Sequence, residues 1–307
     1  MGSVETILKD ELARADRALG GIAPVLSHML ASSGHALVSD AIVARVRGML
    51  NDMARQMLEA IGRVQPATEE NPLSIEALSD ALGSDPAILN HCHAAAMEGH
   101  LAERLDQRSS VDPVLSPLWQ ELIASDDPVT GELAMSAMAA QSRFIQSQRR
   151  MQQPLSELPA DILERSIRIW QRSNPAELGA AIGMAVQSIK QDYDEAESRI
   201  GQLARLVLSM RGGAIAALEL DHAGLALFTS ALAALTDQDR GRAVMACHEG
   251  QAARLAVALR AAGLNPQAIE RQFLLLEPAQ MLPLGLDAMS TETAAAILRQ
   301  SRFENGR

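Results

Sequence analysis

Apolar residues recur at alternating intervals of three and four from Ser39 to Val64, and this spacing constrains the fold more than any other feature. Such steps return to one side of an α-helix, because the helix has about 3.6 residues per turn. Ser39 is a suitable N-cap for it. The repeated positions are Val43, Val46, Leu50, Met53, Met57, Ala60 and Val64. The sequence therefore predicts one long helix whose apolar stripe has to be covered by other helices.

The same intervals continue along the rest of the chain, in stretches such as "ELAMSAMAAQSRFIQSQ" and "ADILERSIRIWQRS". Aromatic residues are scarce, with four Phe, two Trp and one Tyr among 307 residues. The core must therefore consist mainly of Ala, Leu, Ile, Val and Met, which suits packed helices better than sheets. We predict an all-α fold, with an N-terminal helical hairpin or bundle followed by an irregular, HEAT-like helical array.

The segment 65–72, "QPATEENP", has no apolar periodicity and contains two prolines, so it is predicted to be a linker. It separates a helical bundle over 1–64, with helices over 4–18 and 22–32 before the long one, from the array over 73–307. A C-terminal subregion of the array begins near residue 190.

Helix boundaries after the linker are marked by an acceptor side chain followed by proline, a pair suited to the start of a helix. These pairs are Asp85-Pro86, Asp112-Pro113, Asp127-Pro128, Asn174-Pro175 and Asn265-Pro266. Gly212 and Gly213 are predicted to end a helix in the left-handed conformation, and Gly263 and Pro278 are predicted stops. The pairs are irregularly spaced, so the array has no strict repeat period.

The apolar stripe predicts self-association, because a bundle as small as 1–64 covers its faces most easily by forming a homodimer. The predicted dimer seam consists of Val43, Val46, Leu50, Met53, Met57 and Val64. Ile42, Met49 and Ile61 widen the stripe, which favours a bundle over a two-stranded coil. The alternative is that the stripe packs on the rest of the same chain.

Histidines gather in "SDPAILNHCHAAAMEGH", residues 84–100, and raise the question of a metal site. On a helix, His93, Met97 and His100 share a face and could offer ligands to copper. No convincing fourth ligand is evident, so this trio is a weak candidate, and we predict neither a metal nor a cofactor.

A net charge of −11 argues against broad binding of nucleic acid, which depends on many Lys and Arg residues. Cys92 and Cys247 are too few for a disulfide framework, and no secretory signal or membrane-spanning apolar run is evident. We expect a protein of the reducing cytoplasm.

No P-loop, dinucleotide-binding glycine motif, G-x-S-x-G, H-E-x-x-H or C-x-x-C occurs, so no catalytic residue is predicted and the chain is not expected to be an enzyme. The alternative is phosphotransfer with receiver domains, as in a histidine phosphotransfer protein or a pseudo-sensor kinase. His28 or His248 would then accept the phosphate, which requires an imidazole exposed on a helix of a bundle.

The stretch "SRFIQSQRRM" places Arg143, Arg149 and Arg150 around Phe144. In an acidic protein, such a local basic patch with an apolar neighbour could receive an acidic partner. The alternative is a solvated helix end, where cations favour the helix dipole.

The run "LALFTSALAALTDQDRGRAVMACHEGQAARLAVALRAAGLNPQAIERQFLLLEP" resembles the C-terminal part of an all-helical alphaproteobacterial family described as a domain of unknown function. The resemblance covers about residues 190–280, and members of that family often have HEAT-like helical arrays. It implies a bacterial, cytoplasmic, helical protein and no catalytic motif. We expect a non-enzymatic protein-interaction or regulatory module in bacterial cytoplasmic signalling, with an unidentified protein partner.

Overall fold

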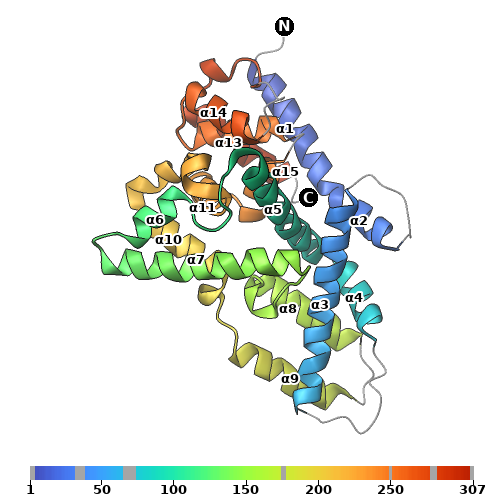
Figure 1. The fold of residues 1–307 in the computed structure, drawn as a ribbon. Coiled ribbons are helices and arrows are strands. Elements are labelled where there is room, and N and C mark those ends of the chain that lie inside the picture. The colour runs from blue at the N-terminus through green and yellow to red at the C-terminus, as the bar shows by residue number, and fades with distance from the viewer. Residues whose placement is uncertain are drawn as a thin grey trace. The chain divides into compact units, whose positions relative to one another are not determined.

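The computed structural model describes residues 4–31, 39–64, 74–173, 178–248, 251–276 and 282–304, and it describes side chains in these ranges except at 28–31 and 302–304. This part of the chain contains fifteen α-helices, several 3₁₀ turns and no strand (Figure 1). The predicted all-α fold is therefore confirmed.

The helices cover most of the described sequence. Their bounds are α1 Val4–Gly20, α2 Ile22–Ala31, α3 Asp40–Val64, α4 Ile75–Gly83, α5 Pro86–Ser109, α6 Pro117–Ile123, α7 Pro128–Arg149, α8 Ala160–Arg172, α9 Gly179–Gln191, α10 Arg199–Ser209, α11 Leu220–Thr236, α12 Arg240–Ala246, α13 Ala252–Ala261, α14 Pro266–Leu276 and α15 Thr291–Glu304. The 3₁₀ turns are η1 Leu155–Glu157, η3 Glu195–Glu197, η4 Arg211–Leu218 and η5 Leu286–Ala288.

Three of the predicted acceptor-proline pairs start helices. The side chains of Asp85, Asp127 and Asn265 accept hydrogen bonds from backbone N–H groups in the first turns of α5, α7 and α14. Asp112 makes the same kind of bonds to Val114 and Leu115, at 2.7 and 2.8 Å, but no helix follows it. The prediction is wrong there, because these bonds close a turn, and α6 begins only after Ser116. Asn174-Pro175 lies outside the described residues.

The predicted stop at Gly263 is confirmed, with a φ of 105° that favours glycine. The stop predicted at Gly212 and Gly213 is wrong, because both glycines continue into η4. The left-handed residue after α10 is instead Arg211, with a φ of 50°. Pro278 lies outside the described residues.

The chain divides into two compact units that do not follow the predicted domain boundary. Unit 1 consists of residues 1–22, 97–142 and 202–307, and unit 2 consists of residues 23–96 and 143–201. The segment 1–64 is therefore not a separate bundle: α1 belongs to unit 1, and α3 belongs to unit 2. The predicted linker 65–72 lies outside the described residues.

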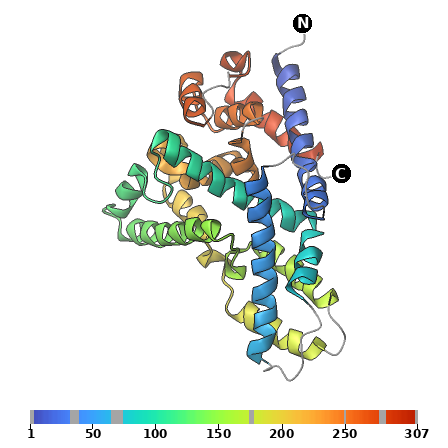
Figure 2. The same cartoon turned by 45° about the vertical axis from the view of Figure 1, so that its right-hand side comes forward.

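Unit 2 is organised around α3, which packs along α4 and α9, while α8 contacts both of those helices (Figures 1 and 2). One face of α8 is buried, and its Trp170 is completely enclosed. The apolar stripe of α3 is therefore covered within its own unit.

Unit 1 is organised around α11, which packs against η4, α6, α12, α13 and α14. Gly224 interrupts α11 with a φ of 71°, which favours glycine, and an added Cβ there would lie 3.3 Å from the Cβ of Ser116. No single helix in the described part of the chain is long and apolar enough to cross a membrane. The 3₁₀ turn η4 and the helix α11, bent by 118° relative to each other, together reach the length and apolar composition of a membrane span. Most residues of α11, however, are buried in unit 1.

Candidate partner-binding surface

The predicted dimer seam lies in the interior of unit 2. Val46, Leu50, Met53 and Met57 are at most 2% exposed, and only Val43 and Val64 are partly accessible. The stripe packs on helices of the same chain, so a seam between two chains through these buried residues is wrong. Periodicity identifies a face that must be covered, but it does not say which helix covers it. Homodimerisation itself stays a prediction.

Beside this buried stripe, α3 holds the segment 151–154, which connects α7 to η1. The Asp52 carboxylate, itself 5% exposed, accepts hydrogen bonds from the backbone N–H of Gln153 at 3.0 Å and from the Gln56 amide at 2.7 Å. Its second oxygen pairs with Arg55 at 2.7 Å. The carboxylate is thus surrounded by donors, which makes it a structural acceptor rather than a free general base.

Gln56 completes the attachment of this segment. Its amide nitrogen donates to the carbonyl of Gln153 at 3.0 Å, and its amide oxygen accepts from the backbone N–H of Leu155 at 3.0 Å. Pro154, between them, has no N–H to satisfy. Two side chains one helical turn apart therefore satisfy the N–H and carbonyl of Gln153 and the N–H of Leu155, where η1 begins.

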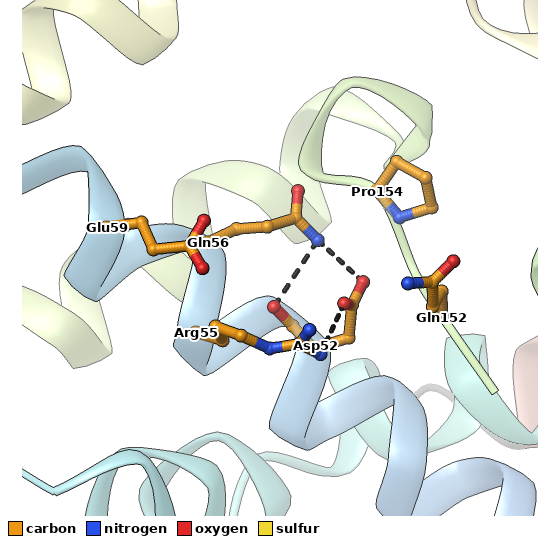
Figure 3. Close-up of a pocket in the computed structure, with 6 residues that line it drawn as sticks. All are labelled: Asp52, Arg55, Gln56, Glu59, Gln152 and Pro154. Carbon is orange, nitrogen blue, oxygen red and sulfur yellow. Dashed lines mark hydrogen bonds and ion pairs between the residues drawn. The ribbon is translucent and has the colours of Figure 1, made fainter. Parts of the chain in front are cut away.

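An open cavity of about 290 Å³ lies where α3 meets the segment, lined by Asp52, Arg55, Gln56, Glu59, Gln152 and Pro154 (Figure 3). In Figure 3 the Asp52 and Gln56 side chains reach toward the segment, and Arg55 and Glu59 extend from the same helix. The side chains that line the cavity donate and accept hydrogen bonds and carry charges of both signs. This arrangement is suited to holding a polar chain segment.

The segment is pressed closely onto α3 at Gly48. A side chain at this position would meet Cβ of Met151 and the Met151 carbonyl oxygen. Met151 itself has a φ of 55°, which is uncommon for a residue other than glycine. The hydrogen bonds of Asp52 and Gln56 to Gln153 and Leu155 form a polar clamp. This clamp and the close approach at Gly48 together fix where the C-terminal end of α7 meets α3.

The four residues predicted to bind a partner lie at this same end of α7, in unit 2. Arg143, Arg149 and Arg150 are exposed, and none of them forms an ion pair within the described residues. Phe144 is partly covered, because the guanidinium of Arg199 lies 3.6 Å from the centre of its ring. Phe144 is therefore engaged within the chain and does not stand open as an apolar anchor.

The histidine cluster lies on α5. His93 and Met97 are buried, at 4% and 5% exposure, and His100 is partly buried. Within the described ranges, no three or more His, Cys, Asp or Glu side chains are grouped so that they could hold a metal ion.

The two predicted phosphoacceptors have different positions. His248 is partly buried in the turn after α12, which ends at Ala246, so it does not have the exposed helical position that phosphotransfer requires. His28 lies in α2, but its side chain is outside the described residues.

Both cysteines are buried thiols. Burial raises the pKa of Cys92 to about 12. Burial, together with the nearby Glu98 carboxylate, raises the pKa of Cys247 to about 12 as well. At neutral pH both thiols are protonated, and a protonated thiol is a poor nucleophile.

Sequence reasoning missed Asp52 and Gln56, although a signal was present. Both continue the wide stripe of α3 from Met49 at helical spacing, so they fall where an apolar residue would be expected. A buried polar side chain in such a stripe needs a partner, and this requirement could have indicated them.

Comparison with known proteins gives no relative from which a function could be carried over: no family model, no curated protein and no solved structure matches this chain.

Proposed function

We propose that the protein is a non-enzymatic protein-interaction module of bacterial cytoplasmic signalling, and that it binds an acidic segment of its partner at the C-terminal end of α7. The observation that supports this best is the pair Arg149 and Arg150. Both are exposed and form no ion pair among the described residues, in a chain whose net charge is −11. Cations kept unpaired on an acidic protein favour and steer an acidic partner.

The setting of these arginines also supports the proposal. They directly precede the segment that Asp52 and Gln56 hold against α3, so they are attached to a fixed backbone. Less freedom is then lost when a partner binds, which favours affinity. Met151, at 41% exposure, adds an apolar contact next to the charges.

The experiment is an affinity capture from a bacterial lysate with three purified proteins: the wild type, the double variant Arg149→Glu/Arg150→Glu, and the matched control Arg168→Glu/Arg172→Glu, which changes the net charge equally. Arg168 and Arg172 are exposed arginines of α8 in the same unit. We expect a partner that the wild type and the control retain and that the double variant binds about tenfold more weakly. Identical capture by all three proteins would contradict the proposal.

The captured partner is then titrated against each protein at low and high salt. Binding through exposed charges is expected to weaken as the ionic strength rises, and the double variant should lose most of this salt dependence. An interaction equally dependent on salt in the wild type and the double variant would assign the binding to another surface.

A further inference from the structure

The first helix docks on the last helices of the same unit, more than two hundred residues away in sequence. α1 packs against α13 and α15, and Val4 at its start lies against Gly285. Gly285 has a φ of 84°, and any side chain there would collide with Val4. One face of α1 is therefore fitted to a surface built by α13, α15 and Gly285.

The docked face of α1 is narrow and carries one buried charge. Its buried side chains are Leu8, Leu12, Ala15 and Asp16. Asp16 forms an ion pair with Arg254 of α13, and these residues are 4% and 1% exposed. Gln251 also donates to the carbonyl of Ala15 at 3.3 Å. A buried ion pair sets the register of a docked helix, because a helix without the acid would leave the guanidinium unpaired.

The connection to α1 is of the kind that allows exchange. α1 ends at Gly20 and is followed by Gly21, and a side chain added at Gly20 would meet nothing within 4 Å. After residue 22 the chain enters unit 2 and returns to unit 1 only at residue 97. α1 thus packs in unit 1, while the chain that follows it runs through unit 2 before it returns. An arm of this kind can dock equally well on a second copy, which is the geometry of domain swapping.

We propose that the surface of α13 and α15 is a helix-binding groove, and that α1 exchanges between two copies of this chain, so that Asp16 of one copy pairs with Arg254 of the other. The groove selects an amphipathic helix with two leucines four residues apart and an aspartate four residues after the second. α1 buries few side chains, and elements with few buried contacts open locally more readily than a core does.

A direct test uses the wild-type chain and a fluorescent peptide of residues 4–21. Anisotropy should rise as the peptide displaces the resident α1. The same peptide with Asp16→Arg should bind about ten times more weakly or worse, whereas Asp10→Asn, on the exposed side of α1, should leave binding unchanged. This peptide experiment uses only the wild-type protein, so it does not depend on whether any variant protein folds. Absence of peptide binding, or equal binding of the Asp16→Arg peptide, would overturn the proposal.

A complementation experiment then tests exchange between whole chains. Asp16→Arg and Arg254→Asp are purified separately, checked for folding by circular dichroism, and mixed. Within each variant the docked pair carries like charges, but in the mixture each arm meets a groove of opposite charge. Native mass spectrometry should show a heterodimer in the mixture that neither variant forms alone. A mixture of folded monomers, or dimers formed equally by each variant alone, would exclude the swapped arm.

Discussion

The guanidinium of Arg240 makes two parallel contacts of 2.7 Å with the carboxylate oxygens of Glu98 in the interior of unit 1. Glu98 is 2% exposed. The same guanidinium reaches the hydroxyls of Thr229 and Ser230, at 3.1 and 2.9 Å. This planar, two-pronged geometry is the strong form of an ion pair, and it joins α5, α11 and α12.

Removing one member of this pair should cost more than removing both. Glu98→Leu leaves a guanidinium without its counter-charge in the interior, and we expect the free energy of unfolding to fall by about 3–5 kcal/mol. Glu98→Leu/Arg240→Met removes both charges and should cost less. Thr229 and Ser230 keep hydrogen bonds to carbonyls of their own helix without Arg240. Urea denaturation measures both values, and a double variant less stable than the single one would contradict this reasoning.

Two glycines of α3 should respond in opposite directions to the same change. Gly48→Ala places a Cβ against Met151, including its carbonyl oxygen at 2.9 Å, so we expect it to destabilise the protein. Gly62 has nothing within 4 Å of an added Cβ, and Gly62→Ala should stabilise by about 0.5–1 kcal/mol, because alanine favours the helix. Thermal unfolding of both variants checks the prediction. Gly48→Ala as stable as Gly62→Ala would disprove the close contact.

The clamp between α3 and the segment after α7 should depend on Asp52 and hardly on Glu59. Asp52→Ala removes the acceptor for the buried N–H of Gln153, at an expected cost of about 1–3 kcal/mol. Glu59→Ala, in the same cavity on an exposed position, should change stability by less than about 0.5 kcal/mol. Denaturation with urea compares the two. Hydrogen exchange at Gln153 and Leu155 should also become faster in Asp52→Ala alone.

Alkaline pH should destabilise the fold through its two buried thiols. The pKa of each is about 12 in the folded chain, against 9.0 for an unhindered thiol. Above pH 9 the unfolded chain loses these protons while the folded chain keeps them, so the free energy of unfolding falls as the pH rises. The slope approaches about 1.4 kcal/mol per pH unit for each thiol.

The useful window for this measurement is pH 9 to 10. Above it Arg254 acts in the opposite direction, because burial lowers its pKa to about 10. Urea denaturation across this window, with Cys92→Ala/Cys247→Ala as the control, measures the effect. An equal slope in the control would assign the pH dependence to other groups.

Helix starts could be predicted from the sequence where the capping side chain and the N–H group that it binds lie within one helical turn. The side chains of Asp85, Asp127 and Asn265 cap N–H groups two or three residues ahead, so the helix starts could be predicted from short motifs. Asp112 failed because the same local bonds also close a turn. The short motif does not contain the information that separates these two outcomes.

The candidate site was only partly predictable. The arginines at the end of α7 stand out by charge alone, and they are exposed as a basic patch requires. Phe144, which was predicted with them, is covered by Arg199, which lies 55 residues later in the sequence, so no local pattern could indicate this contact. Asp52 binds the N–H of Gln153, which lies 101 residues later in the sequence. The periodicity within α3 gives no information about a contact so far away in the chain.

The sequence by itself determined that this chain is helical and where several of its helices begin, because helix periodicity and capping act over a few residues. Only the tertiary structure decided what covers each apolar face. The stripe of α3 could have packed on a second chain, but it is closed by α4 and α9 of its own unit, while α1 leaves its sequence neighbours for α13 and α15. Apolar burial is not directional, so it requires that a face be covered without specifying the partner. The partner is selected by shape and by the few buried polar contacts, such as Asp52 with Gln153 and Asp16 with Arg254.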